Sequence, residues 1–378
     1  MTRPARLTAL DGLRGLAALV VVLYHGSKIA APALEGTAGT VYRVLADSPA
    51  KIVFAGTEAV LVFFALSGLV VALPALRRGF GWRAYFGSRL IRLYLPVWGA
   101  LLVAAALIAL VPRHPSAVSA GSWMQTATAH EVTWQRLLSE ATLWPAVYKL
   151  DNVLWSLRWE VAFSIALPVF IGIALLLRRW AFPAAGAAVL LSVAGRVLDV
   201  EALVYLPVFL AGTLLAVRVE DVRAWGARRS RGFWIAAASV SAATLIAGWL
   251  ARPLIRPDTT GGTVLWGMAA AGAVGLVVTA LGSRGAASAL SYAVPRWLGR
   301  VSFSLYLVHV PVLMTLGYLW GEAAWPAVLA VGIPASLLVA EGFTRLVELP
   351  SHRLALRVRR ALSRDDEQQP ATRAASVP

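Results

Sequence analysis

His25 and Glu160 are the side chains in this sequence whose types best suit proton-transfer chemistry. His25 ends an apolar run in which every residue between Arg14 and His25 is Gly, Ala, Leu, Val or Tyr. Such a run belongs in hydrocarbon, where an ionisable group is costly and indicates a function. A carboxylate that pairs with an imidazole in a low-dielectric site fixes the tautomer and stabilises the imidazolium, which is how a general base is built.

Glu58 and His309 extend these two candidates to a layer of four ionisable side chains. A helix rises about 1.5 Å per residue, which places all four at a similar depth, roughly 16–21 Å from one face of the membrane. Each residue alone has a simpler interpretation, since a single buried His is most often a packing residue and a single Glu can pair with a nearby Arg158. The shared depth favours a common site.

Arginines form a second layer, nearer to one face of the predicted membrane. Arg89 and Arg92 lie three residues apart and would share one face of a helix. The planar guanidinium is well suited to binding phosphate. A phosphate-rich ligand entering from that side would explain the cluster, whereas the simpler alternative is the ordinary positive charge of a cytosolic face. The layer comprises Arg14, Arg89, Arg92, Arg300, Arg345 and Arg353.

The composition places these residues in a membrane. The chain has 378 residues, of which 59% are hydrophobic and 14% charged, and its mean hydropathy is +0.70. No soluble domain has this composition along its whole length, so the sequence predicts an all-α, polytopic integral membrane protein. The absence of cysteine excludes disulfides, thiol nucleophiles and thiolate metal sites, and we predict no metal site.

Stretches of about 20 apolar residues predict about ten transmembrane helices. The first stretch lacks a small-residue cleavage site, so we expect a retained helix rather than a signal peptide. Both termini and the connections on their side hold most of the 35 lysines and arginines, which places both termini in the cytosol. The net charge of +16 is thereby explained without nucleic acid. The predicted spans are roughly 13–33, 52–76, 93–112, 153–177, 180–197, 201–217, 232–250, 263–282, 298–319 and 325–347.

The longest predicted outer loop covers residues 113–152 and carries Trp123, Trp134 and Trp144. Tryptophan at this level is usually an interfacial anchor. The alternative is a platform on which aromatic faces meet the apolar face of a ligand.

The C-terminal segment differs from the rest of the chain. It is rich in Arg and then in Asp, Glu, Gln and Pro, so we expect disorder after Arg364 and contact of its basic part with anionic lipid. The sequence therefore predicts a transmembrane domain over residues 1–350 and a basic, largely disordered cytosolic tail over residues 351–378.

Several motifs resemble those of the membrane-bound acyltransferase 3 family, whose members O-acylate carbohydrates and other hydroxyl acceptors. The spacing from Arg14 to His25 matches the family's Arg-x10-His signature, and WSLRWE at 155–160 resembles its Trp-Ser-Leu-x-x-Glu element. The resemblance implies ten transmembrane helices with both termini in the cytosol. Further matching stretches follow the family's order over nearly the whole chain: FFALSGLVV at 63–71, YFGSRLIRLYLPVW at 85–98, YLPVFLAGTLLA at 205–216, LGRVSFSLYLVHVPV at 298–312 and VELPSHR at 347–353.

The resemblance also implies roles for the residues above. His25 would be the catalytic His and Arg14 its motif partner, with Glu160 as the acidic partner. Acyl-CoA would be the donor substrate, without a permanently bound cofactor. Its phosphates would bind Arg89, Arg92 and Arg300. The residues expected to line the substrate site are Ser156, Trp155, Tyr306, His309 and Glu58.

The sequence therefore predicts an integral O-acyltransferase of the cell membrane. It would move an acyl group, acetyl in the simplest case, from cytosolic acyl-CoA to a hydroxyl of a carbohydrate or similar acceptor that approaches from outside or through lipid. His25 would either deprotonate the hydroxyl or carry the acyl group. Many relatives add a helix and an esterase-like domain after the region of Val347, so we expect this chain to deliver the acyl group itself or through a separate partner.

Two other classes of protein remain open. In a proton-coupled transporter or flippase the midplane His and Glu would relay protons, although such proteins usually show inverted repeats and broken helices, and no repeat is evident in the sequence. In a sensor or scaffold the buried polar residues would be structural. Hydrolysis or transfer of radiolabelled acetyl-CoA by the purified protein separates the classes, since neither alternative predicts it.

Overall fold

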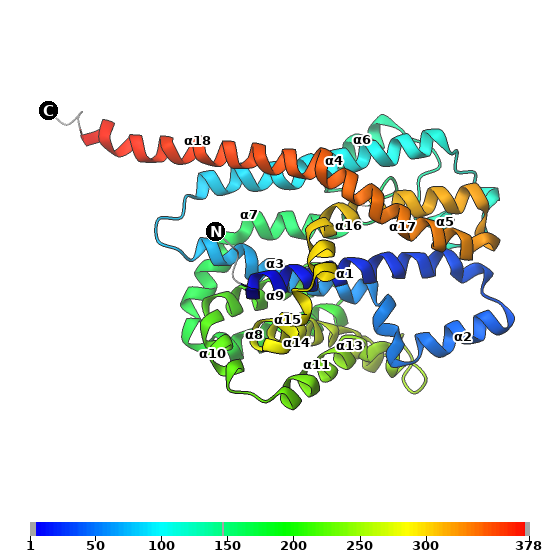
Figure 1. Ribbon diagram of the computed structural model, residues 1–378, viewed down its shortest axis with the longest axis horizontal. Coiled ribbons are helices and arrows are strands. Elements are labelled where there is room, and N and C mark those ends of the chain that lie inside the picture. The colour runs from blue at the N-terminus through cyan, green and yellow to red at the C-terminus, as the bar shows by residue number, and fades with distance from the viewer. Residues whose placement is uncertain (1–4, 146, 375–378) are drawn as a thin grey trace.

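The computed structural model describes residues 5–145 and 147–374, and within these residues it contains helices and connections but no β-strand (Figure 1). The prediction of an all-α protein is confirmed. A 3₁₀ segment, η2, spans Pro49–Phe54, and a π-helical segment, η6, spans Thr344–Glu348. The α-helices are α1 Ala5–Ala30, α2 Gly36–Ala46, α3 Gly56–Ala75, α4 Trp82–Leu110, α5 Trp123–Thr126, α6 Trp134–Ala141, α7 Leu154–Leu176, α8 Ala181–Val197, α9 Glu201–Val217, α10 Val219–Ala227, α11 Arg231–Leu245, α12 Ala247–Leu250, α13 Thr260–Gly267, α14 Ala269–Gly282, α15 Arg284–Leu290, α16 Ala293–Trp320, α17 Trp325–Phe343 and α18 Leu349–Ala374.

In the described part of the chain, 8 helical segments are long and apolar enough to cross a membrane, and 9 if α9 and α10, bent by 70°, form one span. These lengths and compositions are those of a multi-pass membrane protein, but they do not confirm the predicted count of ten. α9 has only 17 residues. The expected span 232–250 divides into α11, of 15 residues, and the single turn α12. Neither reaches the length of a full span.

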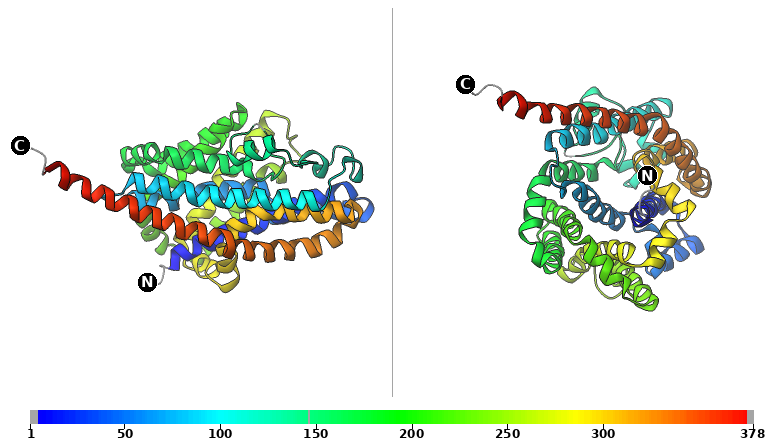
Figure 2. Two further views of the ribbon diagram at one scale, coloured as in Figure 1. Left: turned by 90° about the horizontal axis from the view of Figure 1, so that it is seen from above. Right: turned by 60° about the vertical axis from the view of Figure 1, so that its left-hand side comes forward.

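Most of the long helices run along the long axis of the molecule (Figures 1 and 2). One end, left in Figure 1, holds the first turns of α1, the α3–α4 connection and the C-terminal half of α18, and we call it the basic end. The opposite end holds α2, α5 and α6, and we call it the loop end. Both described chain ends thus lie toward the basic end. That the basic end faces the cytosol stays a prediction from the positive-inside rule.

α1 and α16 cross with their backbones in contact. A Cβ atom on Gly15 would lie 2.3 Å from the Gly299 nitrogen, and one on Gly299 would lie 2.2 Å from the Asp11 carbonyl oxygen. Only a residue without a Cβ atom allows this approach. The contact bears on function because α1 carries Arg14 and His25, and the close crossing fixes both residues against α16.

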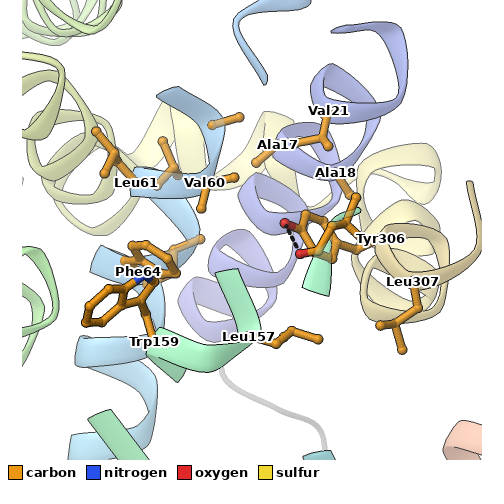
Figure 3. Packing of buried hydrophobic residues seen from close by; sticks show 14 of the residues in the cluster. Ala17, Ala18, Val21, Val60, Leu61, Phe64, Leu157, Trp159, Tyr306 and Leu307 are labelled. Carbon is orange, nitrogen blue, oxygen red and sulfur yellow. Dashed lines mark hydrogen bonds between the residues drawn. The ribbon is translucent and has the colours of Figure 1, made fainter. Parts of the chain in front are cut away.

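Aromatic stacking joins the helices on the other side of the core. Phe209 of α9 stacks on both Phe64 of α3 and Phe163 of α7, with ring centroids 4.5 Å apart in each pair. Figure 3 shows Phe64 beside Trp159, and Tyr306 of α16 directed toward α1. Such offset or stacked pairs add to the stabilisation from burial. They hold α3, α7 and α9 together as one wall of the bundle.

The first turns of α18 pack against α4. Ser351 is buried, and its hydroxyl donates to the Ile91 carbonyl oxygen of α4 at 3.1 Å. α18 packs along α4 and continues to Ala374. The division of the chain at residue 350 and the disorder expected after Arg364 stay predictions.

Candidate active site

A cavity of about 370 Å³ lies among α1, α3, α4, α7, α16 and α18. Its wall is partly apolar, with aromatic side chains such as Phe63 and Phe64. The fold thus brings residues that are far apart in the sequence to one space, and many of them are predicted site residues. The polar and charged lining residues are Asp11, Arg14, Ser67, Tyr85, Ser88, Arg89, Arg92, Ser156, Glu160, Ser302, Tyr306, Glu348, His352 and Arg359.

Glu160 lies in the cavity wall and pairs with Arg89 rather than with His25. Its Oε1 accepts a hydrogen bond from the Arg89 guanidinium, with which it forms an ion pair, and another from Ser67 Oγ at 2.6 Å. Arg89 Nε donates to Ser164 Oγ at 3.0 Å. Because Ser164 follows Glu160 by one helical turn, both face α4. The expected His25–Glu160 pair is therefore not formed, and Arg89 already has a counter-ion within the protein.

His25 forms its hydrogen bond with His309. His25 Nδ1 lies 2.9 Å from His309 Nε2, and His309 Nδ1 lies 2.9 Å from the Leu305 carbonyl oxygen. A carbonyl only accepts, so the network assigns the proton of a neutral His309 to Nδ1 and leaves Nε2 as an acceptor. His25 must then donate from Nδ1. The unprotonated nitrogen of neutral His25 is consequently Nε2, the atom that a general base uses.

Trp123 covers the His25 ring. The two rings are stacked, with centroids 5.1 Å apart and planes inclined by 24°. α5, which carries Trp123, is anchored by Met124, whose side chain is fully buried and whose carbonyl oxygen accepts from Tyr318 OH at 3.1 Å. Trp123 thus packs within the protein on His25, and a role as a platform for a ligand stays a prediction. Trp134 and Trp144 are exposed, and their role as interfacial anchors stays a prediction.

Tyr306 connects the cavity with the imidazole pair. It lines the cavity and lies one turn before His309 on α16, with ring centroids 6.1 Å apart. Its hydroxyl lies 2.6 Å from Ser156 Oγ and donates to the Val153 carbonyl oxygen at 3.2 Å. Neither His25 nor His309 lines the cavity. Tyr306 is therefore the predicted residue that separates the cavity from the imidazoles.

Arg14 lies at the basic end of the cavity and is held by α16. Its Nε donates to Ser302 Oγ at 3.0 Å, its Nη2 donates to the Gly299 carbonyl oxygen at 3.1 Å, and Asp11 lies 3.3 Å from the same Nη2. Eleven residues of α1 separate it from His25, about 16 Å along the helix. The Arg-x10-His spacing thus spans the cavity from its charged end to the level of the imidazoles.

Besides His25 and His309, three further predicted residues do not line this cavity. Arg300 forms an ion pair with Glu341 at 3.0 Å, and half of its side chain is exposed. Trp155 packs on Tyr205, with ring centroids 5.4 Å apart. Glu58 accepts a hydrogen bond from Trp249 in a separate ionic cluster. Similar depth in the membrane did not imply a shared site, because depth leaves the direction of each side chain undetermined.

The cluster around Glu58 is buried near the loop end. Trp249 Nε1 donates to Glu58 Oε1 at 2.7 Å, and Lys51 Nζ lies 3.8 Å from the Trp249 ring centroid. Lys51, which precedes the span formed by α3, is only 2% exposed and donates to the Phe54 carbonyl oxygen at 3.1 Å. Burial lowers the pKa of Lys51 to about 8. The cluster joins α12 to the start of α3.

Sequence reasoning missed Glu348 as a lining residue. Glu348 lies in the π-helical η6 and accepts from Ser304 Oγ at 2.5 Å, and Thr344 Oγ1 donates to Ser304 Oγ at 2.9 Å. π-helical turns occur frequently at functional sites. The signal in the sequence is an acidic residue at the end of an apolar span, within VELPSHR at 347–353.

The fold and the cavity define a multi-pass helical membrane protein with a buried imidazole pair beyond an arginine-lined cavity. A family model described as an acyltransferase domain, that of the acyltransferase 3 family, matches residues 7–344. The chain therefore belongs to this family, which confirms the resemblance of its motifs. No curated protein and no solved structure matches the chain significantly.

Proposed function

We propose that the protein is a membrane O-acyltransferase that moves an acyl group, acetyl in the simplest case, from cytosolic acyl-CoA to a hydroxyl of a carbohydrate or similar acceptor. The observation that carries this proposal is the hydrogen-bond chain from His25 through His309 to the Leu305 carbonyl, which leaves Nε2 of His25 as the basic nitrogen. Membership of an acyltransferase family supports the reaction class.

In the proposed reaction, the acceptor oxygen attacks the carbonyl carbon of the thioester while Nε2 of His25 takes the hydroxyl proton. The carbon–sulfur bond then breaks, and the imidazolium returns the proton to the leaving thiolate, which gives CoA and the O-acyl ester. The alternative is attack by Nε2 itself, which breaks the carbon–sulfur bond, expels the CoA thiolate and forms an acyl-imidazole. The acceptor oxygen then attacks the acyl carbon, the carbon–nitrogen bond breaks, and the hydroxyl proton passes to the thiolate to give CoA. Both routes need the same tautomer, so His309 acts as a positioning residue in each.

The cavity supports the direction proposed for the donor. Arg14 and Arg92 lie in its charged wall, where donors of the guanidinium fork suit phosphate, whereas Phe63 and Tyr306 offer a less polar surface. An acyl-CoA with its phosphates at the basic end would extend its thioester arm toward Tyr306. Arg14 pairs with Asp11 and Arg89 pairs with Glu160, so part of the charge of each is already offset within the protein.

The test uses the full chain in lipid nanodiscs with radiolabelled acetyl-CoA and an envelope extract as the source of acceptors. Wild-type protein should transfer the label or release CoA, while His25→Ala should lose turnover and keep its affinity for CoA, which also serves as the control for folding. A wild-type protein that neither transfers nor hydrolyses acetyl-CoA, but moves protons across liposomes, would favour the transporter alternative.

A further inference from the structure

A second pocket, which we call the loop-end pocket, lies in the long connection between α4 and α7 and has a volume of about 510 Å³. Most of its wall comes from residues 112–136, and Lys149 completes it. It shares no lining residue with the arginine-lined cavity. The ionisable residues of its wall are Arg113, His114, His130, Glu131, Arg136 and Lys149.

The cations of this pocket have neutral partners. Arg113 donates to Thr128 Oγ1, Lys149 Nζ donates to the Thr126 carbonyl oxygen, and Arg136 Nη1 donates to a carbonyl oxygen at 3.0 Å. Within the part of the chain that the structure describes, no carboxylate forms an ion pair with any of the three. Three positive charges therefore face a single acidic lining residue, and the pocket is electropositive.

Arg113 makes this imbalance costly. It is only 2% exposed, and among the described residues its Nε and Nη2 have no hydrogen-bond partner. The nearby Asp151 is fully buried, and burial raises the pKa of its carboxyl well above the usual range. A buried guanidinium with two donor nitrogens left without partners is unfavourable, so the site favours a bound anion.

The loop that forms the pocket is built to hold its shape. The Glu140 carboxylate accepts hydrogen bonds from the backbone nitrogens of Lys149 and Leu150 at 2.8 and 2.9 Å. Ala129 N donates to the Lys149 carbonyl oxygen at 2.7 Å. These bonds fix the backbone that presents the Lys149 side chain. A preorganised pocket of this kind loses little entropy when a ligand binds.

α5 links the loop-end pocket to His25. Gln125 and Thr126 line the pocket, while Trp123, at the other end of this single turn, stacks on the His25 ring. With a rise of about 1.5 Å per residue, the pocket wall and the imidazole cover lie about one helical turn apart. A molecule in the pocket is thus placed close to Trp123, which covers His25.

We propose that the loop-end pocket binds the acceptor through an anionic group of that acceptor, a phosphate or a carboxylate, and so directs its hydroxyl toward Trp123 and His25. The inference rests on the proposed function, since it assigns a class of acceptor to the same reaction. The shared chemistry is an oxyanion held by Arg113, Arg136 and Lys149, which form charge-assisted hydrogen bonds.

Binding of simple sugars tests the pocket independently of turnover. Full-length protein in zwitterionic nanodiscs is saturated with CoA, so that the arginine-lined cavity is filled, and titrated calorimetrically with glucose 1-phosphate, glucuronate and glucose. We expect at least one anionic sugar to bind about tenfold more tightly than glucose, and the double variant Arg136→Gln/Lys149→Gln to lose that preference. Equal binding of all three sugars by wild-type protein would overturn the inference.

A matched double variant, Arg43→Gln/Arg256→Gln, removes two exposed positive charges outside the pocket. It should keep the preference for anionic sugars, and an equal loss in both double variants would reduce the effect to net charge and overturn the inference. A lipid headgroup is the other source of phosphate. Wild-type protein would then bind no sugar phosphate, and the Arg136→Gln/Lys149→Gln variant would differ from wild type only by weaker binding of phosphatidylglycerol in nanodiscs that contain this lipid. That result would assign the pocket to lipid and overturn the acceptor assignment.

Turnover separates this inference from the proposed function. We call Arg136→Gln/Lys149→Gln the pocket variant. If this variant loses anion binding but wild-type protein transfers no acyl group to any acceptor, the pocket is an anion site and the proposed reaction is refuted. Acyl transfer to a neutral acceptor at a rate that the pocket variant does not change would support the reaction and refute the pocket's role. Agreement requires the pocket variant to raise the KM for an anionic acceptor without changing the KM for acetyl-CoA.

Discussion

His25 and His309 share a hydrogen bond of 2.9 Å between Nδ1 and Nε2, and both rings are buried. The bond joins the two helices whose backbones cross at Gly15 and Gly299. It fixes which nitrogen of His25 can accept a proton, because His309 is itself oriented by the Leu305 carbonyl oxygen. The properties of the site therefore depend on a pair of imidazoles rather than on the imidazole–carboxylate pair expected from the sequence.

His309→Ala should lower kcat by about tenfold or more and leave the KM for acetyl-CoA nearly unchanged, since the tautomer of His25 is no longer fixed. His309→Gln should recover part of the rate, because its amide oxygen can accept from His25 Nδ1. The measurement is steady-state acyl transfer by both variants. An Ala variant with wild-type kcat, or a Gln variant no better than Ala, would show that His309 only fills space.

Arg14→Ala should weaken CoA binding, with loss of turnover following from the lost affinity, whereas His25→Ala should abolish turnover alone. Because Arg14 also bonds α16, Ser302→Ala is the matched control that removes one of these bonds and keeps the charge. CoA affinity and thermal unfolding are measured for all three variants. If Ser302→Ala loses as much CoA affinity as Arg14→Ala, Arg14 acts by joining helices rather than by binding the donor.

Arg89→Gln should mainly lower stability, whereas Arg92→Gln should mainly weaken binding of acetyl-CoA. Removing Arg89 leaves the Glu160 carboxylate without its counter-ion, so we expect Arg89→Gln to destabilise the protein by about 3 kcal/mol. The double variant Arg89→Gln/Glu160→Gln should be destabilised by less than the sum of the two single changes. Arg92→Gln should mainly raise the KM for acetyl-CoA. Unfolding in detergent and initial rates provide the two measurements, and equal effects of both single variants on stability and KM would contradict this division.

Lys51 should make the free energy of unfolding rise with pH above about 8. Its pKa is lowered to about 8 in the folded protein from 10.5, so between these values the unfolded chain binds more protons and stability increases as they dissociate. Below pH 8 the contribution is constant. The difference in unfolding free energy between wild type and Lys51→Met, measured from pH 7 to 10, isolates this group, and a difference that does not change with pH would contradict the assignment.

Gly15→Ala should destabilise the protein by about 1–3 kcal/mol and lower activity, because the new Cβ atom would lie 2.3 Å from the Gly299 nitrogen and force α1 away from α16. Gly172→Ala on α7 is the matched control, since a Cβ atom there meets nothing within 4 Å. That control should be neutral or slightly stabilising, as expected for Ala in a helix. Thermal unfolding and acyl transfer are compared, and equal stability of the two variants would refute the tight crossing.

The class of the protein and the layers of its ionisable residues could be read from the sequence alone. A bilayer requires every backbone polar group to be satisfied within a helix, so apolar runs of about 20 residues translate directly into helices. The fixed rise per residue then gives each side chain a depth. That is why His25 and His309 were placed at one level and Arg14 below them. α9 and α11 have 17 and 15 residues and are shorter than a full span, so the helix lengths do not confirm the predicted count of ten.

Which side chains pair with each other was decided only by the tertiary structure. Depth along a helix axis leaves open both the rotation of the helix and the identity of its neighbour, so His25 and Glu160 could share a level without meeting. The glycine contact between α1 and α16 places His25 against His309, while the packing of α4 on α7 brings Arg89 and Glu160 together as an ion pair. Side-chain pairing depends on close packing between helices distant in sequence, and no single helix contains that information.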